Sequence, residues 1–222
     1  NKFDYDDIMK NYIKWVMNGE FTPTGELFDI GRTCLKAIRK YDEGNTIPIE
    51  CGSKSIDSNG NGSLMRILPV ALYSFYKKLD EPGIIKLTNE MSSLTHGHDI
   101  SKLGCYIYVR YVMYLLSGLS KEESYSKIKD LDYSSYSEES IDAYGRILND
   151  DIKKYELDSI SSRGYVVDTL EASLWVLLNT NSFKQAIIGA INLGQDTDTI
   201  GAIVGSMAGI IYGINDIPKS WL

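Results

Sequence analysis

The sequence predicts an all-α fold, a compact single-domain helical bundle that spans residues 1–222. Apolar residues recur at intervals of three and four along most of the chain, which is the pattern of amphipathic helices, whereas the alternation typical of strands is nearly absent. A length of 222 residues, of which 43% are hydrophobic and 24% charged, suits one domain with a substantial core. No internal repeat or change of composition indicates a second domain.

The helical pattern is expected in ten segments. Residues 5–19 place apolar side chains on one face and end at Gly19, a residue typical of helix C-termini. Asp4, Asp6 and Asp7 suit the start of this helix, where negative charge is favourable. The other segments are residues 25–41, 64–77, 83–94, 100–116, 121–130, 138–149, 165–178, 182–192 and 200–214.

Two polar stretches are expected to connect these helices. Residues 43–63, "EGNTIPIECGSKSIDSNGNGS", are rich in glycine, serine and asparagine and therefore form a loop. This loop exceeds the usual connection length, and long loops in compact domains often carry function. Residues 130–140, "DLDYSSYSEES", are expected to be a solvated connection.

The net charge of −7 is unfavourable for nucleic-acid binding, which needs basic groups to neutralise phosphates. The apolar run 200–214 is shorter than the ~20 residues that span a bilayer, so no membrane partner is expected either. Its glycines recur every fourth residue and make one smooth helical face, which favours tight packing inside the bundle. These glycines are Gly201, Gly205, Gly209 and Gly213.

The cysteines indicate a reducing compartment. Cys34, Cys51 and Cys105 are odd in number and have no metal-site spacing. No secretory signal is visible at the start of the sequence. The prediction is therefore a cytoplasmic protein.

The stretch "NLGQDTDTIGAIVG" places Asp196, Thr197, Asp198 and Thr199 directly before an apolar helix. One such side chain is enough to cap a helix. Two carboxylates and a hydroxyl from four consecutive residues are also hard oxygen ligands, which suit Mg²⁺ or Mn²⁺. The pattern alone leaves helix capping and metal binding as alternatives.

The stretch "SNGNGSLMR" is a glycine-rich loop that runs into a helix, an arrangement that offers backbone amides to a phosphate. It lacks the lysine of a P-loop and the third glycine of a dinucleotide fingerprint, so a plain turn is the alternative. Arg66, just after the loop, either meets a phosphate or is solvated or paired with a carboxylate.

The sequence has two histidines, His96 and His98, in "SSLTHGHD". Neither has zinc-ligand spacing to a cysteine or an evident nucleophile partner. A capping or surface role is the default interpretation, and a hydrogen bond to a ligand or ring stacking is the alternative.

Six stretches, in the same order along the chain, resemble the ADP-ribosylglycohydrolase family. This resemblance implies a compact all-α domain and an Mg²⁺- or Mn²⁺-dependent hydrolase. Such an enzyme would cleave the N- or O-glycosidic bond between ADP-ribose and a protein side chain or small molecule. The matching stretches are "GELFDIG", "GNGSLMRILPVAL", "LTH", "GYVVDTLEASLW", "INLGQDTDTIGAIVGSMAGIIYG" and "IPKSW".

The resemblance also implies roles for individual residues. Asp29 and Asp196 match catalytic carboxylates, and His96 and Tyr165 match positions near the adenosine half of the substrate. The metal ligands that it implies are Asp196, Asp198 and Thr199. The loop that it places around the diphosphate is Ser58, Asn59, Gly60, Asn61 and Gly62.

The family's second metal-ligand cluster, Thr-Asp-Asp-Thr, has no match here, so half of a dinuclear ligand set is absent and the chain is expected to be N-terminally truncated relative to the family. Two hypotheses follow: a piece of an active enzyme, or a non-catalytic ADP-ribose-binding or scaffold protein. Apolar surface uncovered by the missing part would favour a rearranged core or association with a partner, such as a second copy in a homo-oligomer. The pattern does not specify the linkage that is cleaved.

Overall fold

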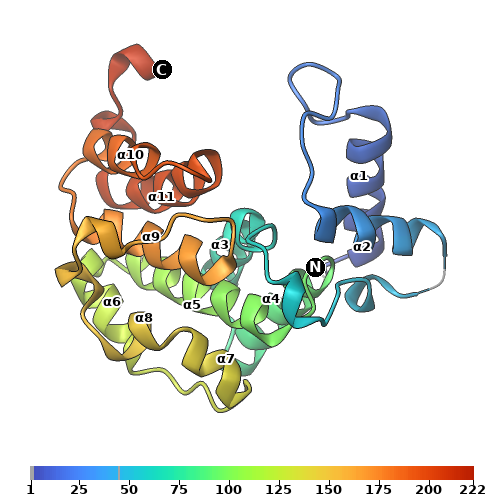
Figure 1. The fold of residues 1–222 in the computed structure, drawn as a ribbon, viewed down its shortest axis with the longest axis horizontal. Helices are drawn as coiled ribbons and strands as arrows, with labels where there is room; N and C mark the ends of the chain where they lie inside the picture. Colours follow the sequence, from blue (N-terminus) through green and yellow to red (C-terminus); the bar gives the residue numbers. More distant parts are fainter. Residues whose placement is uncertain (1–2, 45) are drawn as a thin grey trace.

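The computed structural model describes residues 3–44 and 46–222, and this part of the chain forms eleven α-helices without a sheet (Figure 1). The predicted all-α fold is confirmed. The helices are α1 Tyr5–Asn18, α2 Arg32–Asp42, α3 Leu68–Lys77, α4 Glu81–Ser93, α5 Asp99–Leu116, α6 Lys121–Lys129, α7 Glu138–Ala143, α8 Gly145–Asn149, α9 Val166–Leu178, α10 Phe183–Asn192 and α11 Thr197–Tyr212.

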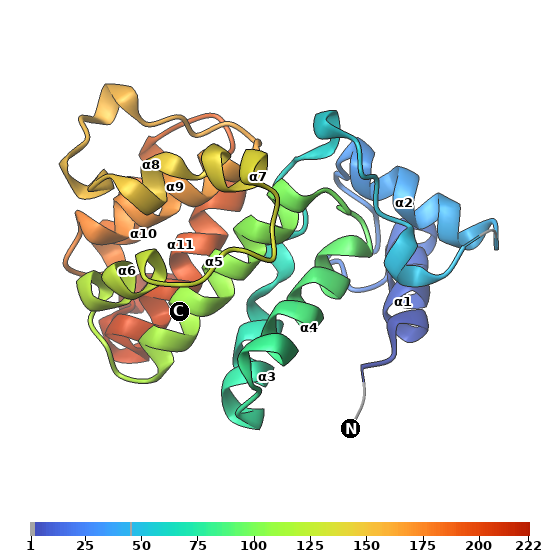
Figure 2. The ribbon, with the colours of Figure 1, turned by 90° about the horizontal axis from the view of Figure 1, so that it is seen from below.

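Helix α5 is the centre of the bundle. It contacts α3, α4, α6, α7, α9 and α11, and Figure 2 shows it between the α3–α4 pair and the group α9–α11. Ile107 and Val109 are both fully buried although they lie on opposite sides of the helix. A helix that is apolar on most of its circumference is a core helix, and six of the other helices pack around it.

Helices α9, α10 and α11 pack against one another and form one wall of the molecule. The expected role of the glycine stripe holds only for the first half of α11. A Cβ atom at Gly205 would lie 3.2 Å from Ile187 of α10, whereas one at Gly209 would meet nothing within 4 Å. Gly213 has a φ of 71° and ends the helix.

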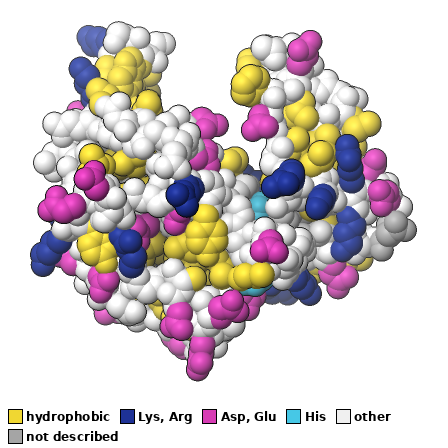
Figure 3. All heavy atoms as spheres, in the orientation of Figure 1, with side chains coloured by type: hydrophobic (Ala, Val, Ile, Leu, Met, Phe, Trp, Pro, Cys, Tyr) yellow, Lys and Arg dark blue, Asp and Glu magenta, His cyan; other side chains and the backbone are white. Residues whose placement is uncertain are grey.

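Helices α1 and α2 form a separate lobe, across an opening from α9–α11 (Figure 1), and the space-filling view shows a hollow between the two parts (Figure 3). The lobe is held by α1–α2 packing and by the Tyr41 hydroxyl, which donates to Asp6 at 2.7 Å. Asp4 accepts from the backbone amide of Asp7 at 3.0 Å and so caps α1, as predicted. Gly19 ends α1 in the left-handed conformation.

The helix expected over residues 25–41 begins only at Arg32. The chain doubles back before it, so that a Cβ atom at Gly19 would lie 2.1 Å from the carbonyl oxygen of Gly25. Gly25 itself has a φ of 76°. Residues 25–31 therefore cross the lobe as an irregular segment, and the apolar spacing that predicted a helix there was misleading.

Other segments also differ from the predictions. Residues 64–77 form a 3₁₀ turn over Leu64–Arg66 before α3, and residues 138–149 form two short helices. The stretch 130–140 is not simply solvated, because Tyr133 and Tyr136 are buried against the ring of Tyr106. The burial of these two tyrosine rings anchors the connection, although the polar composition of the stretch did not indicate it.

Within residues 3–44 and 46–222, no helix is long and apolar enough to cross a membrane. All three cysteines are free thiols.

The buried ammonium of Lys121 joins α6 to the C-terminal end of α9. It donates to the carbonyl oxygens of Leu177, at 3.1 Å, and of Thr180, and to the side-chain oxygen of Asn181 at 3.2 Å. We expect Lys121→Met to lower the free energy of unfolding by about 2–3 kcal/mol, because buried acceptors would lose a charged donor.

Urea denaturation measures this difference. Lys86→Met, at an exposed position of α4, is the matched control and should change stability little. Equal stability of the two variants would contradict the role given to Lys121.

Candidate functional site

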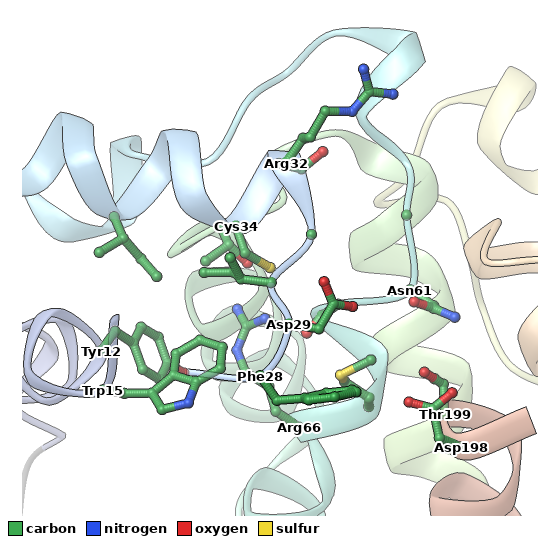
Figure 4. A pocket seen from close by; sticks show the side chains of 18 of the residues that line it. Tyr12, Trp15, Phe28, Asp29, Arg32, Cys34, Asn61, Arg66, Asp198 and Thr199 are labelled. Atoms are coloured by element: carbon green, nitrogen blue, oxygen red, sulfur yellow. Dashed lines mark hydrogen bonds between the residues drawn. The ribbon is translucent and has the colours of Figure 1, made fainter. Parts of the chain in front are cut away.

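A cleft of about 1090 Å³ opens between the α1–α2 lobe and the start of α11. Most of its lining comes from three parts of the chain: the first lobe, the glycine-rich loop with the turn that follows it, and the first residues of α11. The close-up in Figure 4 shows Asp29 on one side of the opening and Asp198 and Thr199 on the other. The fold thus brings together residues that are far apart in the sequence.

Asp196 lies at the N-cap position of α11 but does not cap the helix, because no side-chain hydrogen bond caps this end. Its carboxylate instead accepts from the side-chain amide of Asn61 at 2.6 Å. Asp196, Asp198 and Thr199 all line the cleft. No hydrogen bond joins the Asp198 carboxylate or the Thr199 hydroxyl to another described residue. The capping interpretation of Asp196 is therefore wrong.

Asn61 joins the glycine-rich loop to α9 and to the start of α11. Besides Asp196, its side-chain amide donates to the hydroxyl of Thr169 on α9 at 2.9 Å, and its backbone amide donates to the Gly164 carbonyl at 3.0 Å. The Thr169 hydroxyl donates in turn to the Arg163 carbonyl at 3.1 Å. Because Asn61 is buried, these bonds fix both the loop and the rotamer of the Asp196 side chain.

The other residues of the glycine-rich loop either hold the loop in place through hydrogen bonds or line the cleft. Asn59 is buried, donating to the Ile56 carbonyl at 2.9 Å and accepting from the Ser101 hydroxyl at 2.8 Å. Ser58 donates to Ser53 at 2.9 Å and faces a neighbouring groove rather than the cleft. Gly60, Asn61 and Gly62 line the cleft itself. Of the five predicted loop residues, the structure therefore brings three to the cleft.

Tyr165 lies just before α9, beside the same loop. Its backbone pairs with that of Gly60, and its side chain is 39% exposed. Partial burial, together with the negative charges of Asp168 and Glu139, raises the pKa of its hydroxyl. Tyr165 is not among the described residues that line the cleft, although its backbone pairs with a residue that does.

His96 lies beneath the loop and is almost completely buried, at 1% exposure. Its Nδ1 is 2.7 Å from the Thr95 hydroxyl, and a Cβ atom at Gly62 would lie 3.0 Å from its Cε1. Burial, reinforced by the charge of Arg66, lowers the pKa of His96 to about 3, so the ring is neutral. The default capping or surface role is wrong for His96 but right for His98, which caps α5 by accepting from the Ile100 amide.

Arg66 supports the loop from the cleft side. Its guanidinium donates to the carbonyl oxygens of Gly62, at 2.5 Å, and Met91, at 3.2 Å, and lies 5.6 Å from the centre of the Tyr12 ring. Neither of the alternatives considered for Arg66 foresaw bonds to backbone carbonyls. The separation of four residues between Gly62 and Arg66 could have indicated the bond to Gly62, because in a helical turn it places the Arg66 side chain over the preceding turn.

Asp29 reaches the cleft because residues 25–31 are not helical. It and its neighbour Phe28 are exposed, and both line the cleft. Phe28 is 100% exposed, a high value for an aromatic side chain, and the sequence interpretation did not single it out. Cys34, at the first turn of α2, also faces the cleft close to the loop.

The oxygen donors at the start of α11 have the chemistry that a hard divalent cation prefers. They amount to two carboxylates and one hydroxyl, and Asn61 already occupies one carboxylate oxygen of Asp196. Among the residues that the structure describes, no group of three or more His, Cys, Asp or Glu side chains is placed to hold a metal. The donor types therefore fit Mg²⁺ or Mn²⁺, as one part of a ligand set.

These features define an all-α protein in which an acidic helix start and a glycine-rich loop, joined by the Asn61–Asp196 hydrogen bond, line one cleft. The chain belongs to the ADP-ribosylglycohydrolase family, whose model matches residues 1–222. It is 32% identical, over its whole length, to an ADP-ribosylarginine hydrolase, Tri1, of Pseudomonas putida (strain GB-1). It is 29% identical, over 99% of its length, to the ADP-ribosyl-[dinitrogen reductase] glycohydrolase of Rhodospirillum rubrum.

A solved structure described as an ADP-ribosylglycohydrolase-related protein complex has a similar fold. Its TM-score is 0.78 at 25% sequence identity, and the match covers 99% of this chain and 68% of that one. The chain spans 56% of the Pseudomonas relative and 65% of the Rhodospirillum relative. The family predicted from the motifs is thereby confirmed.

The burial of neutral His96 predicts a pH-dependent stability. Because its pKa is about 3 in the folded chain and near 6.5 when unfolded, the unfolded state binds the extra proton. Stability is therefore lost as the pH falls from about 6.5 towards 3, by about 2 kcal/mol at pH 5 for this one group. We expect His96→Asn to be less stable near neutral pH and to lose this part of the pH dependence.

Urea denaturation near pH 7 and pH 5 measures the effect, and His98→Asn is the control that should retain the full dependence. Carboxylates contribute equally to both variants. An identical pH dependence in the two variants would show that His96 is not held neutral.

The contact between Gly62 and the residues below it predicts a difference between two glycines. A Cβ atom at Gly62 would lie 2.8 Å from the Cys34 sulfur and 3.0 Å from the His96 ring, whereas one at Gly60 has its nearest neighbour at 3.7 Å. We expect Gly62→Ala to cost about 1–3 kcal/mol of stability and Gly60→Ala to cost little. Thermal unfolding compares them, and equal costs would contradict the close packing of the loop on His96.

Proposed function

We propose that this chain belongs to an enzyme that hydrolyses the N-glycosidic bond between ADP-ribose and an arginine side chain, with Mg²⁺ or Mn²⁺ as cofactor. The observation that carries the proposal is the placement of Asp29 and the acidic start of α11 on opposite sides of one cleft. The arginine linkage is supported by the name of the Pseudomonas relative.

The cleft suits ADP-ribose in size and lining. Small-molecule pockets have volumes of about 300–1000 Å³, and this one, at about 1090 Å³, is large enough for a dinucleotide-sized ligand. Gly60 and Gly62 allow close approach of a diphosphate to the backbone. Arg66, which lines the cleft beside them, adds a positive charge.

The metal would be held by Asp198, Thr199 and the carboxylate oxygen of Asp196 that Asn61 leaves free. When bound, it would orient the ribose hydroxyls and polarise the anomeric centre. Asn61 holds the Asp196 carboxylate in place through its 2.6 Å hydrogen bond, so that this ligand needs little reorganisation on binding.

Asp29 would act from the opposite side of the cleft. Cleavage of a glycosidic bond develops positive charge at the anomeric carbon, and a nearby carboxylate stabilises that charge. The same carboxylate would position the guanidinium leaving group, because carboxylates bind guanidinium through paired hydrogen bonds. Its location on an exposed, irregular segment is typical of residues that meet a substrate.

A second candidate function is binding of ADP-ribose without catalysis. It is favoured by the small number of metal donors, since the described chain places no group of three suitable residues around a cation. In that case the loop and Arg66 would hold the ligand without turnover. The metal response of ligand binding separates the two candidates.

The test is isothermal titration with ADP-ribose, in Mg²⁺ and then in EDTA. For the hydrolase we expect EDTA to weaken binding about tenfold or more, equivalent to about 1.4 kcal/mol. Asp198→Asn should bind as weakly in Mg²⁺ as the unaltered chain does in EDTA. Asp142→Asn, an exposed carboxylate of α7, is the control that should retain the metal response.

Release of ADP-ribose from an ADP-ribosylated arginine peptide is the matching activity measurement. Metal-independent binding without release would support the binding protein. No binding in either condition would contradict both functions for this chain, and an unchanged metal response in Asp198→Asn would contradict the ligand assignment.

A further inference from the structure

A second groove, of about 630 Å³, lies on the other side of α2. One wall is the helix itself, and the other is the segment of residues 51–58. Figure 3 shows Lys and Arg side chains gathered on the lobe that carries α2. We call this feature the basic groove, and its cations are Arg32, Lys36 and Lys40.

The three cations form a line along one helical face. They are spaced four residues apart, so consecutive charges are about 6 Å apart along the helix axis and the line is about 12 Å long. All three are exposed, and none forms an ion pair with a described carboxylate. Lys40 donates to the Glu50 carbonyl at 2.7 Å, which holds its ammonium over the groove without neutralising it.

The facing wall is polar and carries few opposing charges. Asp57 is the one carboxylate among the described residues that line the groove, whereas the chain as a whole has a net charge of −7. Ser53, Ser55 and Ser58 bring hydroxyl groups to this wall. Ser53 accepts from Ser58 at 2.9 Å and from the Ser55 amide at 3.2 Å, which leaves its own hydroxyl hydrogen for another acceptor.

The basic groove is continuous with the cleft. Arg32, Thr33 and Asp57 line both, and in Figure 4 the Arg32 guanidinium points away from Asp29. A molecule held at Asp29 can therefore extend past the start of α2 into the groove.

We propose that the basic groove binds an acidic, extended peptide segment of the ADP-ribosylated substrate protein, next to its modified residue. This inference rests on the proposed function, which places the modified side chain at Asp29. In an extended strand, alternate residues are about 6.6 Å apart and point to the same side. Three acidic residues at alternate positions would thus match the spacing of Arg32, Lys36 and Lys40.

The lining favours a peptide over a nucleic acid, although both are extended anions. Proteins that bind single-stranded nucleic acids combine positive charge with aromatic rings on which the bases stack. The described residues that line the groove include no aromatic side chain.

The test is fluorescence anisotropy with a fluorescein-labelled peptide that carries glutamate at alternate positions. We expect saturable binding that weakens with added salt, and a loss of about tenfold or more in Lys36→Glu. Arg39→Glu is the matched control, because it makes the same charge change on an exposed residue of α2 that does not line the groove. It should change the affinity less than about threefold.

Asp57→Asn should strengthen binding, because it removes the one opposing carboxylate described in the groove. A peptide with lysine in place of glutamate should not bind. Equal losses in Lys36→Glu and Arg39→Glu, or tighter binding of an oligothymidylate or of inorganic pyrophosphate, would overturn the proposal. Titration of Lys36→Glu with ADP-ribose separates this result from the proposed function, since that binding should be unchanged.

Discussion

The hydrogen bond between Asn61 and Asp196 is the interaction on which the arrangement of the site depends. These residues are 135 positions apart, and their contact joins the glycine-rich loop to the start of α11. Both partners have other fixed connections: Asn61 to Thr169 and the Gly164 backbone, and the Asp196 amide to the Ser162 carbonyl at 3.1 Å. The Asp196 carboxylate is therefore held by the same network that shapes the loop. A change in the loop or at the start of α11 is expected to reach the other through this network.

Two basic residues, His96 and Arg66, support the glycine-rich loop, and neither is paired with a described carboxylate. His96 is buried and neutral, and Arg66 donates to backbone carbonyls rather than to a carboxylate. Near each other in a low-dielectric interior, two positive charges would be costly, and the neutral state of His96 avoids this. As a result, the positive charge of Arg66 remains available beside Gly60 and Gly62. In an acidic protein, that charge gives the cleft one region suited to an anion, opposite the region of Asp196 and Asp198 suited to a cation.

The periodic spacing of apolar residues predicted most of the helices, because the long helices around α5 bury continuous apolar faces. The errors came from segments in which backbone geometry or aromatic burial decided the outcome. The spacing of Leu27, Ile30 and Cys34 resembles a helix, but the close approach of Gly19 and Gly25 excludes one. For the site, the motifs singled out Asp196, Asp198 and Gly60–Gly62, and all of these residues line the cleft. They could not show that Asn59 and His96 are buried supports, because burial depends on contacts with distant segments.

Helix α2 illustrates how one short element can serve two surfaces. Cys34 faces the cleft and packs near Gly62, whereas Lys36 and Lys40 face the basic groove. Ala37 and Ile38 are buried and fix the rotation of the helix, so the two sets of side chains cannot exchange places. Arg32, at the first turn, borders both surfaces. This geometry means that a substrate side chain and the backbone next to it would contact opposite sides of the same helix end. Recognition of the modified residue and of its neighbouring sequence would then be coupled through the position of α2.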